Sequence, residues 1–170
     1  MLEETEKAIE LLAKEGSTKK TSRKTKERKL SFDIADHLHY NYTDAVFRFD
    51  VGADVKLTIG QASIINNKLR HRRGYHDLTI LEPRGGYFGL FIELKKGISE
   101  VYTKKGLLAK RKNNRTGTDH NVEQRDHLLN MISKGYYATY GFGKEATIKI
   151  IDQYMALPPT VCLMDKNILL

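Results

Sequence analysis

The chain has 170 residues, with 29 Lys and Arg against 21 Asp and Glu, which gives a formal net charge of +8. This length suits one domain with a core, or a compact domain with an arm, and a hydrophobic content of 40% excludes a disordered polyelectrolyte. The single cysteine, Cys162, excludes a disulfide framework and any multi-cysteine zinc or iron–sulfur site. No uncharged apolar run is long enough to span a bilayer, so we expect a cytoplasmic protein that does not enter membranes.

The basic charge is concentrated in three stretches. Residues 17–30, 66–73 and 103–115 contain seven, four and six Lys or Arg, and the only acid among them is one Glu in the first stretch. Positive charge gathered into patches indicates a nucleic-acid binder, because each neutralised phosphate releases counterions. The alternative is a set of solvated loops and a tail.

The chain before residue 27 is expected to lie outside the core. Residues 1–14 have apolar positions at helical spacing, which predicts a short amphipathic helix that contacts a partner or frays. Residues 16–26 contain no apolar side chain and are typical of a linker. We therefore divide the chain into an N-terminal helix and basic linker (1–26), a folded domain (27–157) and a C-terminal tail (158–170).

The folded domain begins with a predicted helix that ends near Tyr40. Its apolar stripe consists of Leu30, Ile34 and Leu38. Alternation over residues 45–49 predicts a strand, and residues 60–69 are expected to form a short helix.

Two strand-like runs follow, at residues 76–81 and 87–94. The five residues between them, 82–86, include a proline and two consecutive glycines. Proline and paired glycine between apolar runs predict a hairpin. The basic, glycine-containing stretch 95–118 is expected to be a surface loop.

The last elements are a helix, a strand and a helix. Residues 119–134 have helical apolar spacing, with Thr118 or Asp119 as the cap and Gly135 as the end. Residues 136–140 predict a strand and 141–143 a turn. A helix over 144–155 should stop before Pro158 and Pro159, so the domain belongs to the α/β class.

An acid and a base two residues apart interrupt the apolar second strand of the hairpin. Residues i and i+2 of a strand share a face, so Glu93 and Lys95 point the same way. If Leu81 pairs with Tyr87, Asp77 lies diagonal to Glu93. All three polar groups then share one face at one end of the hairpin, unless a bulge intervenes.

Two carboxylates beside an ammonium suit a hard-cation site. Mg²⁺ prefers oxygen ligands and keeps several waters. A cation held there would polarise a phosphate and activate a water, while Lys95 orients that water or stabilises the developing charge. The alternative is a surface salt bridge between Lys95 and Glu93 next to an ordinary Asp77.

These motifs resemble a known family. The sequences Gly-Tyr-His-Asp at 74–77 and Phe-Ile-Glu-Leu-Lys at 91–95, with Gln124 in the following helix, look like the VRR-NUC branch of the PD-(D/E)XK nuclease superfamily. The resemblance runs from about Glu27 to Met155 and is to the small stand-alone members of phages and bacteria. It implies a restriction-endonuclease-like αβββαβ core, with a mixed central sheet flanked by helices. It also implies divalent-metal-dependent hydrolysis of DNA in a bacterial or phage-infected cell.

The resemblance also implies roles for individual residues. Asp77 and Glu93 would bind Mg²⁺ or Mn²⁺, the Leu94 carbonyl would be a further ligand, and Lys95 would be the catalytic lysine. Gln124 would be the helix glutamine near the scissile phosphate or the metal ligands.

Two further positions, Glu27 and His76, each have two interpretations. Glu27 matches the acidic residue that some family members add to the site, and it is also an ordinary charge at a helix N-terminus. His76 replaces the signature proline before the aspartate. It is either a plain strand residue or a contact to phosphate or to a ligand.

Basic residues flank the expected site on both sides along the chain. We interpret them as phosphate contacts without base specificity, or alternatively as a solvated rim. Tyr102 in the loop would stack on an unpaired base or simply pack. The basic residues are Arg70, Arg72, Arg73, Lys104, Lys105, Lys110, Arg111, Lys112 and Arg115.

The sequence therefore predicts a metal-dependent DNA endonuclease. Stand-alone relatives resemble junction resolvases, so we expect branched DNA as substrate and a homodimer that places two sites on two strands. The alternatives are a nickase or general endonuclease on linear duplex DNA, and a non-catalytic DNA-binding module with the same fold.

Overall fold

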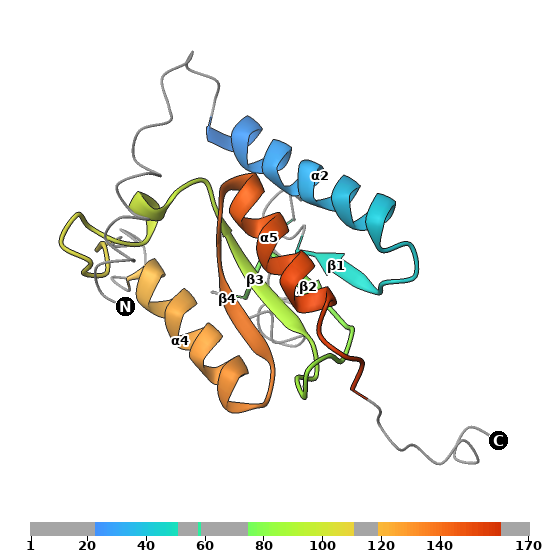
Figure 1. Cartoon of the computed structure of the whole chain (residues 1–170). Helices are drawn as coiled ribbons and strands as arrows, with labels where there is room; N and C mark the ends of the chain where they lie inside the picture. The colour runs from blue at the N-terminus through green and yellow to red at the C-terminus, as the bar shows by residue number, and fades with distance from the viewer. Residues whose placement is uncertain (1–22, 51–57, 59–74, 111–118, 161–170) are drawn as a thin grey trace.

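The computed structural model describes residues 23–50, 58, 75–110 and 119–160. The expected order of elements from residue 27 onward is confirmed, while the helices expected at 1–14 and 60–69 lie outside the described residues. The elements are α2 (Arg23–Asn41), β1 (Phe47–Phe49), β2 (Leu78–Ile80), β3 (Leu90–Lys95), the 3₁₀ turn η2 (Ile98–Glu100), α4 (His120–Ser133), β4 (Tyr137–Phe142) and α5 (Gly143–Met155) (Figure 1).

The four strands form one mixed sheet in the order β1-β2-β3-β4. The pairs β1–β2 and β2–β3 are antiparallel, and β3–β4 is parallel. A parallel pair needs a crossover connection, which α4 supplies here. The expected αβββαβ arrangement with a mixed central sheet is thus confirmed. None of the described helices is long and apolar enough to cross a membrane.

One face of the sheet carries the main hydrophobic core. Leu90 and Ile92 of β3 pack there with the predicted stripe of α2, in which Ile34 and Leu38 are fully buried. Helix α5 closes this core. It contributes Ile151, Tyr154 and Met155.

The opposite face of the sheet lies under α4. Strand alternation turns Phe91, Glu93 and Lys95 to this side, where α4 presents the buried Gln124 and Leu128. The sheet thus separates an apolar core under α2 and α5 from a layer under α4 that holds the buried charged residues beside apolar ones.

The predicted hairpin register is wrong by two residues. The Arg84–Tyr87 pair closes the turn around Gly85 and Gly86, both with positive φ, and residues 81–89 connect the strands. The strands themselves pair Leu78 with Ile92 and Ile80 with Leu90. A shift of two leaves every side chain on its expected face, so the face assignment survives the error.

The turn predicted at 141–143 is also wrong. Gly141 and Phe142 complete β4, and Gly143 begins α5 with φ +77°. Gly141 is needed for close packing, because a Cβ there would collide with the Thr147 hydroxyl and lie 2.9 Å from Ile92 Cγ2. The glycine therefore marks the approach of α5 to the sheet and not a chain reversal.

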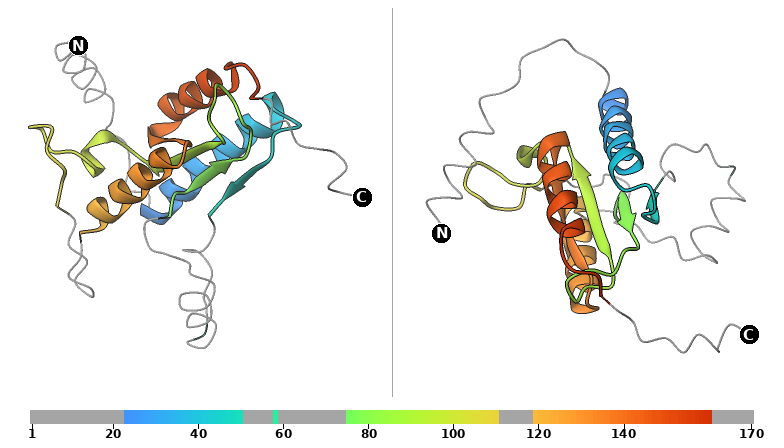
Figure 2. Two further views of the ribbon diagram at one scale, coloured as in Figure 1. Left: turned by 90° about the horizontal axis from the view of Figure 1, so that it is seen from below. Right: turned by 45° about the vertical axis from the view of Figure 1, so that its right-hand side comes forward.

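The connection between β3 and α4 starts later than expected. Lys95 is the last residue of β3, and η2 begins at Ile98. The chain then forms a loop that extends away from the sheet, closed by the Tyr102–Leu108 bridge (Figure 2).

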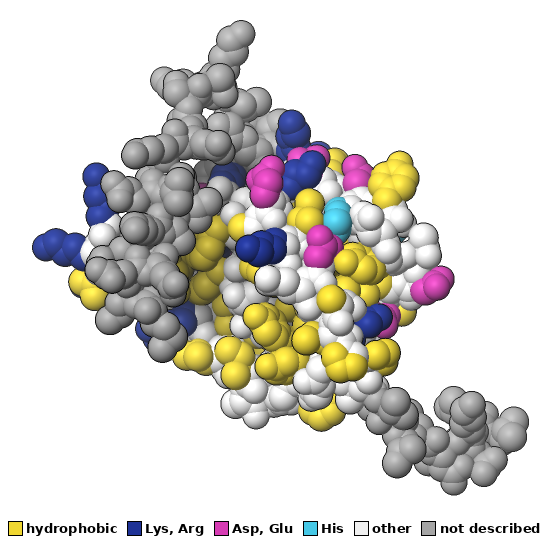
Figure 3. Space-filling model, viewed as in Figure 1, with side chains coloured by type: hydrophobic (Ala, Val, Ile, Leu, Met, Phe, Trp, Pro, Cys, Tyr) yellow, Lys and Arg dark blue, Asp and Glu magenta, His cyan; other side chains and the backbone are white. Residues whose placement is uncertain are grey.

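Exposed aromatic side chains occur at the end of the sheet where β3 begins. Tyr87, Phe88 and Tyr137 all keep a third or more of their surface accessible. Figure 3 shows hydrophobic side chains gathered over the lower half of the face seen in Figure 1.

Candidate active site

Glu93, Lys95 and Gln124 form a hydrogen-bonded group between β3 and α4. Glu93 and Lys95 are only 2% and 6% exposed. The Lys95 Nζ donates to Glu93 Oε1 at 2.9 Å and to Gln124 Oε1 at 2.8 Å, and Gln124 Nε2 donates to Glu93 Oε1. The salt bridge between Lys95 and Glu93 considered above is therefore present, but it is buried and not at the surface.

Asp77 reaches the same place from the end of β2. Extending the Leu78–Ile92 pairing by one position brings Asp77 beside Glu93. The Leu94 N–H donates to Asp77 Oδ2 at 2.8 Å, so the carboxylate occupies the position that a further strand residue would fill. The structure thus brings Asp77, Glu93, Lys95 and Gln124 together.

The two carboxylates disfavour each other's ionised form. Burial and the neighbouring Asp77 charge raise the pKa of Glu93 from its ordinary value of 4.5 to about 8, and Lys95 opposes this rise. Burial also raises the pKa of Asp77, against the opposing effects of the Leu94 N–H and the Lys95 charge. Two buried acids side by side are costly unless a positive charge joins them.

The donor set suits a hard divalent cation. Within the described part of the chain, the buried Glu93 Oε2 accepts no hydrogen bond from an N–H group or a hydroxyl. Carboxylate oxygens are the ligands that Mg²⁺ and Mn²⁺ prefer. No group of three or more acidic, His or Cys side chains with metal-binding geometry occurs among the described residues. Asp77 and Glu93 are the carboxylates that β2 and β3 bring side by side, and they could hold such an ion together.

His76 is a packing residue. It is 1% exposed, lies against the rings of Tyr75, Phe91 and His127, and its Nε2 is 2.7 Å from Thr79 Oγ1. Burial and the proximity of His127 lower the pKa of His76 to about 3. The imidazole therefore stays neutral near physiological pH, and His76 packs just before the start of β2 and not within a strand.

Asp50 is a neighbour of the site that the sequence analysis did not select. Its N–H donates to the Asp77 carbonyl at 2.8 Å, and its charge contributes to the raised pKa of Asp77. The available signal was a carboxylate directly after the alternating strand at 45–49. Only the β1–β2 pairing shows that this position lies next to Asp77.

Tyr140 is the second residue that sequence reasoning missed. It pairs with Glu93 across β3 and β4, and its buried hydroxyl has no hydrogen-bond partner among the residues that the structure describes. Burial, together with Tyr102 and Glu93, raises the pKa of this phenol. Tyr102 packs edge-on against Tyr140 and Phe142, which agrees with a packing role for Tyr102.

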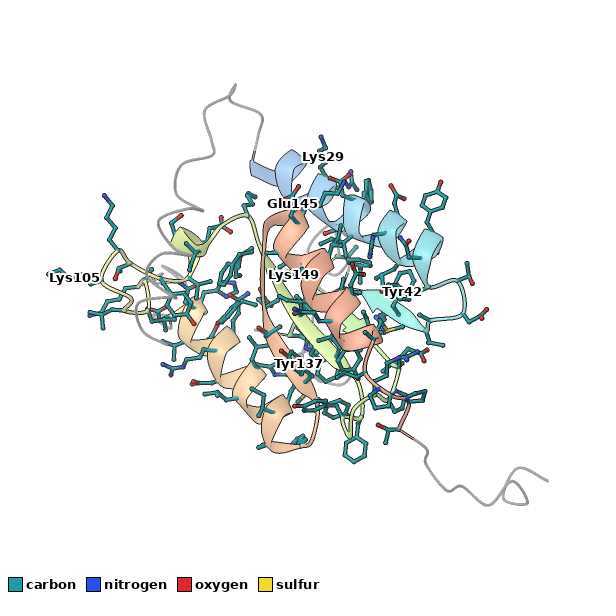
Figure 4. All side chains as sticks on the ribbon, in the orientation of Figure 1. Lys29, Tyr42, Lys105, Tyr137, Glu145 and Lys149 are labelled. Carbon is teal, nitrogen blue, oxygen red and sulfur yellow. The ribbon has the colours of Figure 1, made fainter. Side chains whose placement is uncertain are left out.

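Only some of the residues predicted to contact phosphate lie in the described part of the chain. Lys104, Lys105 and Lys110 are exposed in the projecting loop, and Figure 4 shows Lys105 at its outer edge. The other predicted basic residues, and the side chain of Glu27, lie outside the described part of the chain. They are Arg70, Arg72, Arg73, Arg111, Lys112 and Arg115.

Comparison with solved structures shows the same fold in another protein. A chain named "VRR_NUC domain protein" superposes with a TM-score of 0.53 at 20% sequence identity, over 84% of this chain and 94% of that chain. No family model and no curated protein matches the sequence. The resemblance to the VRR-NUC family is thereby confirmed at the level of the fold.

Proposed function

We propose that the protein is a divalent-metal-dependent DNA endonuclease. The observation that carries this proposal is the pair of carboxylates formed by the half-buried Asp77 and the buried Glu93, with the Lys95 ammonium on the same face. A protein that only binds DNA gains nothing from buried acids at the position where a phosphate would approach. The fold shared with a VRR_NUC domain protein supports the same conclusion.

Asp77 and Glu93 would hold Mg²⁺ or Mn²⁺, with the Leu94 carbonyl as a further ligand. When bound, such an ion supplies a Lewis acid for a phosphate oxygen and a more acidic water. Lys95 stabilises the negative charge that develops on the phosphate, or orients the attacking water. Gln124 holds the Lys95 Nζ and Glu93 in place through its two amide atoms.

Branched DNA is the proposed substrate, and a homodimer the proposed working form. Two sites related by a twofold axis would reach two strands of one junction. The projecting loop with Lys104 and Lys105 would contact phosphates without reading bases.

A cleavage assay tests this proposal. Purified protein is incubated with labelled four-way junction, flap, nicked and linear duplex DNA in Mg²⁺, Mn²⁺ or EDTA. We expect cutting only with a divalent ion, and a loss of about 100- to 1000-fold for Lys95→Ala, the scale seen when one positioned charge-stabilising group is removed. Lys149→Ala, which removes an exposed lysine of α5, is the matched control and should cut normally.

The substrates separate the alternatives. Cutting of linear or nicked duplex as fast as of the junction would favour a general endonuclease or a nickase. Tight binding without cutting in every metal would contradict the proposal and favour the non-catalytic DNA-binding module.

A further inference from the structure

A chain of aromatic rings lies beside the proposed site. Ring centroids are 4.0 Å apart for Tyr75 and His76 and 4.0 Å apart for His76 and Phe91, with interplanar angles of 30° and 32°. Phe91 continues to Tyr136 at 4.7 Å, and Tyr136 to Phe88 at 5.8 Å. The rings therefore form a continuous packed series along this face of the sheet.

The two ends of this series are its most exposed members, and Tyr136 between them is half-buried. His76 and Phe91 are buried, whereas Tyr75 is 45% exposed and Phe88 is also exposed. Phe88 lies before the start of β3, at the end of the sheet away from Asp77. Tyr75 precedes Asp77 by two residues, so their Cα atoms are at most about 7.6 Å apart.

Tyr75 is held rigidly for an exposed side chain. Its ring lies 4.0 Å from the His76 ring and 5.3 Å from that of His127 on α4. His76 is itself packed on the other side against Phe91 at 4.0 Å, so the support of the Tyr75 ring is aromatic. An exposed ring that is already oriented loses little conformational entropy when a planar ligand stacks on it.

The position of Tyr75 near Asp77 indicates which kind of ligand could contact its ring. A nucleic-acid strand advances about 3.4 Å per nucleotide, so the base one or two nucleotides from a phosphate at Asp77 and Glu93 falls within reach of Tyr75. Exposed aromatic rings next to phosphate contacts are typical of sites for unpaired nucleotides, because every base has a face that can stack on a ring.

We propose that Tyr75 is a stacking platform for an unpaired nucleobase next to the phosphate that is cut. This inference rests on the proposed function and adds a substrate requirement to it. The favoured DNA is one with an unstacked base close to the scissile bond, as at a junction or a flap. Fully paired linear duplex lacks such a base.

A binding experiment without cleavage tests this site. The full-length protein in EDTA is titrated with flap DNA that carries the fluorescent base 2-aminopurine at the first unpaired position, and with paired linear duplex. We expect stacking to quench the fluorescence in the wild type and in Tyr75→Phe. Tyr75→Ala should lose the quenching and bind the flap about 5- to 150-fold more weakly, with unchanged affinity for duplex.

Two controls keep the result specific. Tyr40→Ala removes a tyrosine of α2 that is 83% exposed, and it should bind both DNAs as the wild type does. Thermal unfolding of each variant checks that the fold persists. If Tyr75→Ala stays folded and still quenches the flap probe, stacking is wrong while the endonuclease proposal stands. If the wild type binds neither DNA, the proposed function fails and this inference fails with it.

Discussion

At the scale of single residues, Glu93 links protein stability to pH. Its pKa in the folded protein is about 8, against an ordinary value of 4.5, so the folded state retains a proton that the unfolded chain releases. The stabilising effect of this proton is complete below about pH 4.5 and is lost as the pH rises through 8. Asp77, whose pKa is also raised, adds to the same trend.

We therefore expect the midpoint temperature of thermal unfolding in EDTA to decrease as the pH rises from 5 to 9. Glu93→Gln should flatten most of this fall, because the amide does not titrate and still accepts from Lys95. Glu145→Gln, at an exposed position in the first turn of α5, should keep the wild-type slope. Thermal unfolding measured across this pH range checks both variants, and an unchanged slope in Glu93→Gln would show that another group is responsible.

The residues of the site differ in how far the sequence revealed them. Glu93 and Lys95 stood out because charged residues two apart interrupted an apolar strand, and strand periodicity alone placed them on one face. Asp50 and Tyr140 carry no such local signal. Their neighbours come from β2 and β3, which are distant along the chain, so only the strand pairing brings them to the site.

At the scale of elements, Asn121 fastens the projecting loop to α4. Its fully buried side chain donates to the Glu100 carbonyl at 3.1 Å and to the Ala109 carbonyl at 2.6 Å. One amide group thus holds both arms of the loop that carries Lys104 and Lys105.

We expect Asn121→Ala to loosen this loop and to cost about 1–3 kcal/mol of stability, because two carbonyls lose their donor. Hydrogen exchange should accelerate at the Thr103 and Ala109 amides, which bond to Leu107 and Val101, before it accelerates in β3. Equal acceleration in β3 would contradict a local role. Asn130→Ala, at an exposed position of the same helix, serves as the control.

Element types were predictable where the local signal was sufficient. Helix α4 begins at its predicted cap, since the Asp119 side chain accepts from the Asn121 N–H, and it ends before Gly135 at φ +85°. The role of Gly141 was not predictable. A glycine between polar and aromatic residues indicates a turn, and only the packing of Thr147 and Ile92 against it explains the strand.

At the scale of the whole molecule, the clustered positive charge predicts salt-sensitive DNA binding. The logarithm of the binding constant should fall linearly with the logarithm of the salt concentration. Each phosphate contact adds about 0.9 to the steepness of that slope. If Lys104 and Lys105 each contact a phosphate, replacing both with Gln should reduce that slope by about 1.8. The double variant Lys134→Gln/Lys149→Gln removes the same charge from exposed positions just after α4 and on α5, and it should leave the slope unchanged. Fluorescence anisotropy over a salt series gives both slopes, and equal losses would indicate a diffuse charge effect.

The division of the sheet into an apolar face and a polar face separates stability from chemistry. The core under α2 and α5 has ordinary hydrophobic packing, while the costly buried charges all lie under α4. Changes in α4 should therefore alter the site without removing the main core.

The Asp77 side chain extends the sheet beyond the last residue pair of β2 and β3. Through its bond with the Leu94 N–H, the position of the Asp77 carboxylate relative to Glu93 follows the pairing of β2 with β3 and not the course of a loop. A cation shared by Asp77 and Glu93 would then act as a removable cross-link between these strands. Fraying of this end of the sheet would release the ion, and the ion in turn would resist fraying. Cation binding and the stability of this end of the sheet would thus be thermodynamically coupled.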